Sequence, residues 1–114
     1  AIETATNYAI PHGIAVTIGM DIANFVAVEL DMTSSSHFER MHEVLDKNCK
    51  TYRHVNISVD TLLNALSKDK KNSTTQLRLI LPDKNRVIGI GLYDNNERLK
   101  NSIDKYLKTY SIDN

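Results

Sequence analysis

IAVTIGMDIANFVAVEL, residues 14–30, is the longest apolar run of the chain, and it decides the fold. Its polar members Thr17, Asp21 and Asn24 recur at i, i+4 and i+7, so on a helix they form one narrow stripe. These polar members argue against a membrane span, for which the run is only marginally long enough. A helix that is apolar on nearly every other side is typical of the buried centre of a bundle, and we expect it to be covered all round.

Further helices are predicted on the C-terminal side of this run. One extends from Ser36 to about Cys49, a second is capped by Ser58 and ends at Lys68, and a last one begins after a cap at Asp94 or Asn95. The apolar residues expected to face the core recur at spacings of three and four: Phe38, Met41, Val44 and Leu45, then Val59, Leu62, Leu63 and Leu66, then Leu99, Ile103, Tyr106 and Leu107.

The spacing of the apolar residues changes between the helix that ends at Lys68 and the last helix. Residues 75–81 alternate and are rich in strand formers, residues 82–85 supply turn chemistry, and residues 86–92 are the return strand. The predicted fold class is therefore mainly α, a helical domain of about five helices with one β-hairpin. We expect residues 1–114 to form a single domain.

Composition excludes several classes of protein. Fourteen Lys and Arg balance fourteen Asp and Glu, which argues against a nucleic-acid binder that relies on excess positive charge. The single cysteine, Cys49, excludes an internal disulfide and a multi-cysteine zinc site. It suits a reducing compartment, so we expect a cytoplasmic protein with no membrane or nucleic-acid partner.

His12 is the first candidate functional residue, because it stands between Pro11 and Gly13 at the entry to the apolar helix. There the backbone can approach a ligand closely and free amides point outward. The alternative is a histidine that merely caps the helix entry. The remaining histidines, His37, His42 and His54, lack the spacing of a metal site and are predicted to be surface or structural residues.

Lys70 and Lys71 are the second candidates, within the basic cluster of residues 68–72. Their ammonium groups could grip an anionic substrate, with Arg78 nearby, or could simply stabilise a helix C-terminus. Gly89 and Gly91 form only a GxG in a strand, which does not make a phosphate-binding loop.

Three segments together resemble one family, 3-dehydroquinate synthase. Ala1-Ile2-Glu3 resembles the end of its His-Ala-Ile-Glu stretch, and residues 12–20, HGIAVTIGM, resemble its His-Gly-Glu-Ala-Val-x-x-Gly-Met motif. Asp69-Lys70-Lys71 followed by residues 78–82, RLILP, resembles its later Asp-Lys-Lys and Arg-Leu-x-Leu-Pro elements. The order and the intervals agree over nearly the whole chain.

The resemblance implies that this chain is the helical C-terminal domain of a lyase of the shikimate pathway, which leads to the aromatic amino acids. The family converts a seven-carbon keto-acid sugar phosphate to 3-dehydroquinate, with loss of phosphate, in a cleft between this domain and an N-terminal nucleotide-binding domain. It uses NAD and a divalent metal, zinc or cobalt, and many members are homodimers. We expect the chain alone, without that N-terminal domain, to bind neither cofactor tightly and to be inactive.

Carried over by this resemblance, His12 is a metal ligand, and Lys70 or Lys71 binds the substrate's anionic groups. Ile14 departs from the family, which usually has glutamate there, and the change removes a carboxylate that could orient the site. Three alternatives therefore stay open: another sugar-phosphate cyclase such as 2-deoxy-scyllo-inosose synthase, an iron-dependent alcohol dehydrogenase, or a stand-alone helical binding module. The Asp-Lys-Lys segment favours the cyclases over the dehydrogenases.

Overall fold

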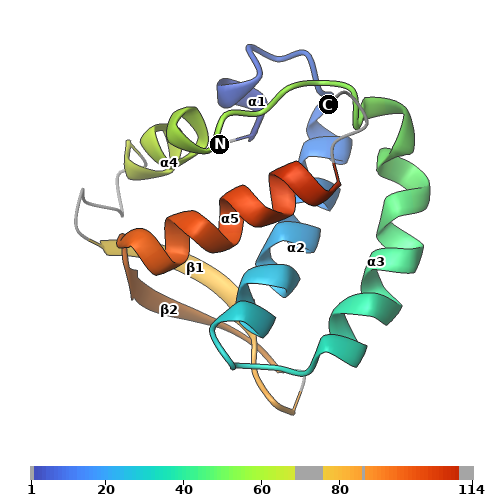
Figure 1. Ribbon diagram of the computed structural model, residues 1–114. Coiled ribbons are helices and arrows are strands. Elements are labelled where there is room, and N and C mark those ends of the chain that lie inside the picture. Colours follow the sequence, from blue (N-terminus) through green and yellow to red (C-terminus); the bar gives the residue numbers. More distant parts are fainter. Residues whose placement is uncertain (1, 69–75, 86, 111–114) are drawn as a thin grey trace.

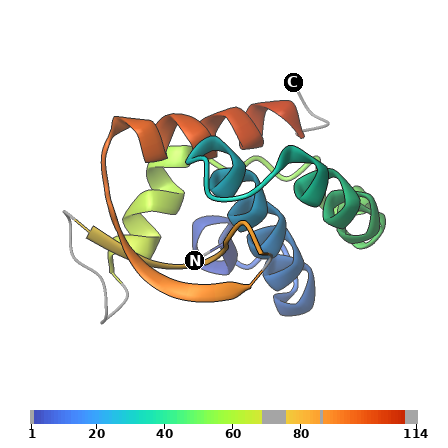
Figure 2. The same ribbon diagram turned by 90° about the horizontal axis from the view of Figure 1, so that it is seen from below.

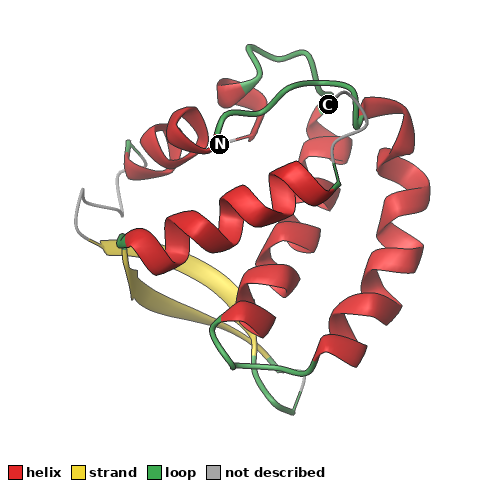
Figure 3. Cartoon of the chain, viewed as in Figure 1, coloured by secondary structure: helices red, strands yellow, loops and turns green. Residues whose placement is uncertain are grey.

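The computed structural model describes residues 2–68, 76–85 and 87–110. In chain order its elements are α1 (Ile2–Ala5), α2 (His12–Glu29), α3 (Ser35–Cys49), the short 3-10 helix η1 (Lys50–Tyr52), α4 (Val59–Ser67), β1 (Gln76–Pro82), β2 (Ile88–Asp94) and α5 (Glu97–Thr109). Strands β1 and β2 pair antiparallel (Figure 3). The predicted mainly helical domain with one hairpin is therefore confirmed.

Helix α2 lies at the centre of the domain. It lies between α5 and the hairpin, with α3 alongside, as Figures 1 and 2 show from two directions. Every helix and strand β1 contribute to one core, whose fully or nearly fully buried members include Ile10, Ile18, Val26, Ala27, Cys49, Leu62, Leu77, Leu99, Ile103 and Tyr106. Burying this apolar surface is the main force that holds the helices together.

The expectation that α2 is covered on every side is wrong. Val16 and Met20 are 47% and 43% exposed, whereas the polar Asp21 and Asn24 are buried. The polar stripe turns inward because Asp21 finds hydrogen-bond donors there, and an apolar face is left outward. Among the helices in the described ranges, none is long and apolar enough to cross a bilayer.

Helix α3 begins as the sequence predicts but presents a different face. Ser34 is its N-cap and accepts a hydrogen bond from the His37 amide at 3.3 Å. Phe38 and Cys49 are buried and His42 lies on the same side, but Val44 is 60% exposed, so its predicted core position is wrong. Residues 38, 42 and 49 stand at i, i+4 and i+11 on one side of the helix, which packs against its partner, and residue 44 points away from that side.

The second strand and the last helix begin two residues or so later than predicted. The Asp83 carboxylate accepts hydrogen bonds from the amides of Asn85 and Val87, so the turn extends to Val87 and β2 begins at Ile88. Strand β2 then continues to Asp94, which pairs with Gln76. Asn96, rather than Asp94 or Asn95, therefore caps α5, and it accepts the Leu99 amide at 3.0 Å. Ser58 caps α4 as predicted.

Candidate functional site

His12 is the first residue of α2, and its imidazole is held by a carboxylate. His12 Nδ1 lies 2.9 Å from Glu3 Oε1 of α1, with the histidine side chain 77% exposed and the glutamate side chain 29% exposed. A carboxylate oxygen accepts hydrogen bonds, so Nδ1 donates and, in the neutral ring, Nε2 keeps its lone pair. The contact therefore presents Nε2 of an exposed ring as a donor atom for a metal.

The turn between α1 and α2 brings these two side chains together. Asn7 and Tyr8 both have positive φ, 55° and 62°, and the Tyr8 amide donates to the Glu3 carbonyl at 2.7 Å. Two consecutive non-glycine residues in the left-handed region are uncommon and cost conformational energy. This unfavourable backbone conformation occurs in the turn that brings Glu3 into contact with His12.

The N-terminus of α2 is exposed to solvent. Pro11 is the N-cap residue and no side chain caps the helix, so the alternative that His12 caps the helix entry is wrong. Apart from its chain neighbours and the adjoining backbone of the helix, no described atom lies within 4 Å of the position that a Cβ on Gly13 would occupy. Packing within the chain therefore does not require glycine here, and the first-turn amides of α2 lie beside an exposed imidazole.

His12 fits a metal site as one ligand of several. Within the described ranges no three His, Cys, Asp or Glu side chains converge as a metal site requires. The donor set at α2 is one imidazole whose other nitrogen is hydrogen-bonded to a carboxylate, the usual arrangement of a metal-bound histidine. Since a catalytic zinc takes three protein ligands, the others would have to come from outside the described residues.

The other predicted site residues cannot be placed in the same way. Lys70 and Lys71 lie outside the described residues, as does the side chain of Arg78, whose backbone belongs to β1. Ile14 is half-buried and packs against the core. The glutamate that the family usually has at this position is absent, but His12 still has a carboxylate partner, because Glu3 of α1 provides one.

A second polar cluster lies in the interior, and sequence reasoning missed it. Asp21 Oδ2 accepts hydrogen bonds from His42 Nδ1 and Tyr106 Oη, both at 2.6 Å, and lies 3.4 Å from Arg53 Nη2. Arg53 also donates to Tyr106 Oη at 2.9 Å and forms an ion pair with Asp46 at 2.9 Å. This buried network (Asp21, His42, Arg53, Tyr106, Asp46) joins α2, α3, α5 and the segment after η1. The predicted structural role of His42 is confirmed.

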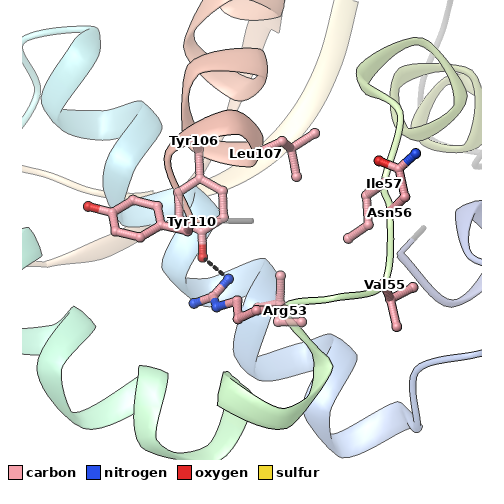
Figure 4. Close-up of a pocket in the computed structure, with 8 residues that line it drawn as sticks. Arg53, Val55, Asn56, Ile57, Tyr106, Leu107 and Tyr110 are labelled. Carbon is pink, nitrogen blue, oxygen red and sulfur yellow. Dashed lines mark hydrogen bonds between the residues drawn. The ribbon is translucent and has the colours of Figure 1, made fainter. Parts of the chain in front are cut away.

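The buried network holds the fold rather than a substrate. A cavity beside it, which Arg53, Tyr106 and Tyr110 help to line, has a volume of about 30 Å³, the size for a water molecule (Figure 4). Burial and the nearby Asp21 charge raise the pKa of the Tyr106 phenol well above its ordinary value, so the phenol stays protonated as a donor. The sequence signal that could have revealed this network is the aspartate on the polar stripe of α2, because a buried carboxylate requires hydrogen-bond donors around it.

Comparison with known proteins agrees with the sequence motifs. The family model described as 3-dehydroquinate synthase C-terminal matches residues 1–72, a span that includes both Glu3 and His12. The chain belongs to this family. No solved structure matches the chain.

Several curated relatives are named 3-dehydroquinate synthase. One from Microcystis aeruginosa is 37% identical over 82 residues, which cover 71% of this chain and 22% of the relative. One from Helicobacter pylori (strain G27) is 31% identical over 112 residues, 96% of this chain and 31% of the relative. One from Nostoc punctiforme is 33% identical over 92 residues, which cover 79% of this chain and 25% of the relative. The chain thus spans less than a third of the length of these relatives.

Proposed function

We propose that this chain is the C-terminal domain of a 3-dehydroquinate synthase, a lyase of the shikimate pathway. The substrate would be a seven-carbon keto-acid sugar phosphate that loses its phosphate. The contact between Glu3 and His12 carries this proposal, because it leaves one imidazole nitrogen free at an exposed helix entry within the family-matched region. The family likeness of the chain supports the reaction type.

In this proposal His12 provides one ligand to a divalent metal, zinc or cobalt, and Glu3 fixes the orientation of the ring. A metal bound there would polarise the substrate oxygen atoms and stabilise the charge that develops on them. The other ligands and the NAD site would lie in the polypeptide that precedes this region in the synthases, so the chain alone would hold neither cofactor tightly. In this proposal, the task of the described residues is to orient the metal-binding imidazole.

The proposed location is the cytoplasm, and the proposed enzyme is a homodimer. Cys49 is fully buried and burial raises the pKa of its thiol, with Arg53 opposing the shift, so the thiol stays protonated and unreactive. This single inert thiol suits a reducing compartment.

Phosphate release tests the function directly. The polypeptide that joins this chain to an N-terminal nucleotide-binding domain, supplied with NAD and Zn²⁺ or Co²⁺, is expected to release inorganic phosphate from the seven-carbon substrate. The 114-residue chain under the same conditions is expected to release none. If the joined protein binds NAD and metal yet leaves this substrate intact, the reaction is assigned wrongly, and turnover of another sugar phosphate would favour a related cyclase, as Ile14 suggests.

Lys70 and Lys71 are proposed to bind the anionic groups of the substrate. Replacing both with alanine in the joined protein is expected to raise KM by about tenfold, since two charge-assisted contacts are removed, and to weaken the salt dependence of KM. Lys84, which lies in the hairpin turn, gives a matched control as Lys84→Ala. An unchanged KM and salt response would assign the two lysines to a solvated helix end.

A further inference from the structure

The apolar face of α2 forms one wall of a groove with a volume of about 490 Å³. Val16 and Met20 of α2 lie on this wall, Ile80 and Ile88 of the hairpin lie on another, and Leu66 of α4 also lines it. Four of these five side chains are more than 40% exposed, Leu66 being half-buried. A connected apolar surface of this kind marks an interaction site, because water solvates it poorly.

The lining of the groove suits a polypeptide rather than a charged small molecule. Among the described lining residues, Glu3 alone has a formal charge at neutral pH when histidine is neutral, and its carboxylate already binds His12. Asn24 and His37 are the other polar members of a lining that is otherwise aliphatic. The centres of protein interfaces are likewise depleted of charged side chains, and the described lining of this groove follows that pattern.

Two observations identify the occupant. The chain matches a C-terminal family model and spans only 22% to 31% of the length of the relatives described above. Ile2 and Glu3 also line the groove, so its occupant would lie beside the residue that holds the His12 ring. We propose that the groove is the docking surface for the polypeptide that precedes this region in the synthases. The inference rests on the proposed function, and it explains how further ligands would reach His12.

Methionine oxidation measures the occupancy of the groove. Met20 and Met41 line it, whereas Met32, in the turn after α2, does not. Sulfoxide formation by hydrogen peroxide, followed by mass spectrometry, is compared between the 114-residue chain and the protein joined to the preceding polypeptide encoded in its own gene. Met20 is expected to oxidise about tenfold more slowly in the joined protein, because oxidation follows exposure, while Met32 reacts equally in both.

Matched substitutions locate the contact. Val16 and Val44 are both exposed helix residues, but only Val16 lines the groove. In the joined protein Val16→Glu is expected to restore fast oxidation of Met20 and to lower the melting temperature, whereas Val44→Glu does neither. Both variants of the 114-residue chain should melt like the parent, since neither side chain belongs to the core.

Three results would overturn the proposal. Equal oxidation of Met20 in the two proteins would show that the preceding polypeptide lies elsewhere. A gene with no preceding polypeptide would leave the groove without this occupant. Concentration-dependent protection of Met20 in the chain alone, together with dimers in sedimentation velocity, would assign the groove to a second copy. None of these readouts uses turnover, so a failure of the groove is distinguishable from a failure of the proposed reaction.

Discussion

Replacing His12 with alanine in the joined enzyme is expected to abolish metal-dependent turnover, with a loss of at least about 100-fold in kcat, since a direct ligand would be removed. The same change should leave the melting temperature of the 114-residue chain nearly unchanged. The His12 side chain is 77% exposed and contributes little packing, and its contact with Glu3 is an exposed ion pair or hydrogen bond of small net energy. A large loss of activity with an intact fold is the signature of a ligand.

Glu3→Gln and His54→Ala complete this experiment. Glu3→Gln keeps the size of the side chain but removes its charge, and it is expected to weaken metal binding by about 10-fold to 100-fold, the usual effect of disturbing a hydrogen bond to a ligating histidine. His54 is an exposed histidine in the segment after η1, so His54→Ala should change neither metal content nor kcat. A His12→Ala enzyme that keeps its metal by elemental analysis, and keeps its turnover, would rule out the ligand role.

Sequence periodicity predicted most of the fold because each helix carries a local signal. The start of α3 near Ser36, the cap at Ser58 and the alternation of the hairpin depend on neighbouring residues, and the structure places them within about two residues of the expected positions. Periodicity does not reveal which apolar face finds a partner within the same chain. The outward face of α2, with Val16 and Met20, was therefore predicted to be buried and is not.

The two polar sites differ in how far sequence reasoning could reach. His12 was found through its motif, but the role of Glu3 depends on a turn through Asn7 and Tyr8 in the left-handed region. Asn7 favours the left-handed region, but Tyr8 does not, so the sequence does not signal two consecutive residues in this conformation. The partners of Asp21 lie 21, 32 and 85 residues away along the chain, so only the assembled fold brings them together.

Replacing Asp21 with alanine is expected to produce the largest loss of stability, about 3 kcal/mol or more in the free energy of unfolding. The carboxylate is fully buried and one of its oxygens accepts from His42, Arg53 and Tyr106. Removing it leaves a buried guanidinium with Asp46 as its remaining carboxylate partner in the network and leaves the Tyr106 hydroxyl without its acceptor. Urea unfolding followed by circular dichroism measures the loss.

Asp60→Ala is the matched control for this substitution. Asp60 forms an ion pair with Lys100 at 3.1 Å, but its side chain is 77% exposed, and such pairs contribute little to stability. If Asp21→Ala unfolds at the same urea concentration as Asp60→Ala, the buried network does not hold α2, α3 and α5 together. If it unfolds far earlier, loss of turnover in an Asp21 variant follows from loss of the fold. His12→Ala is expected to lose turnover at full stability, so the two substitutions together separate the residue that would bind the metal from the residue that keeps its helix in place.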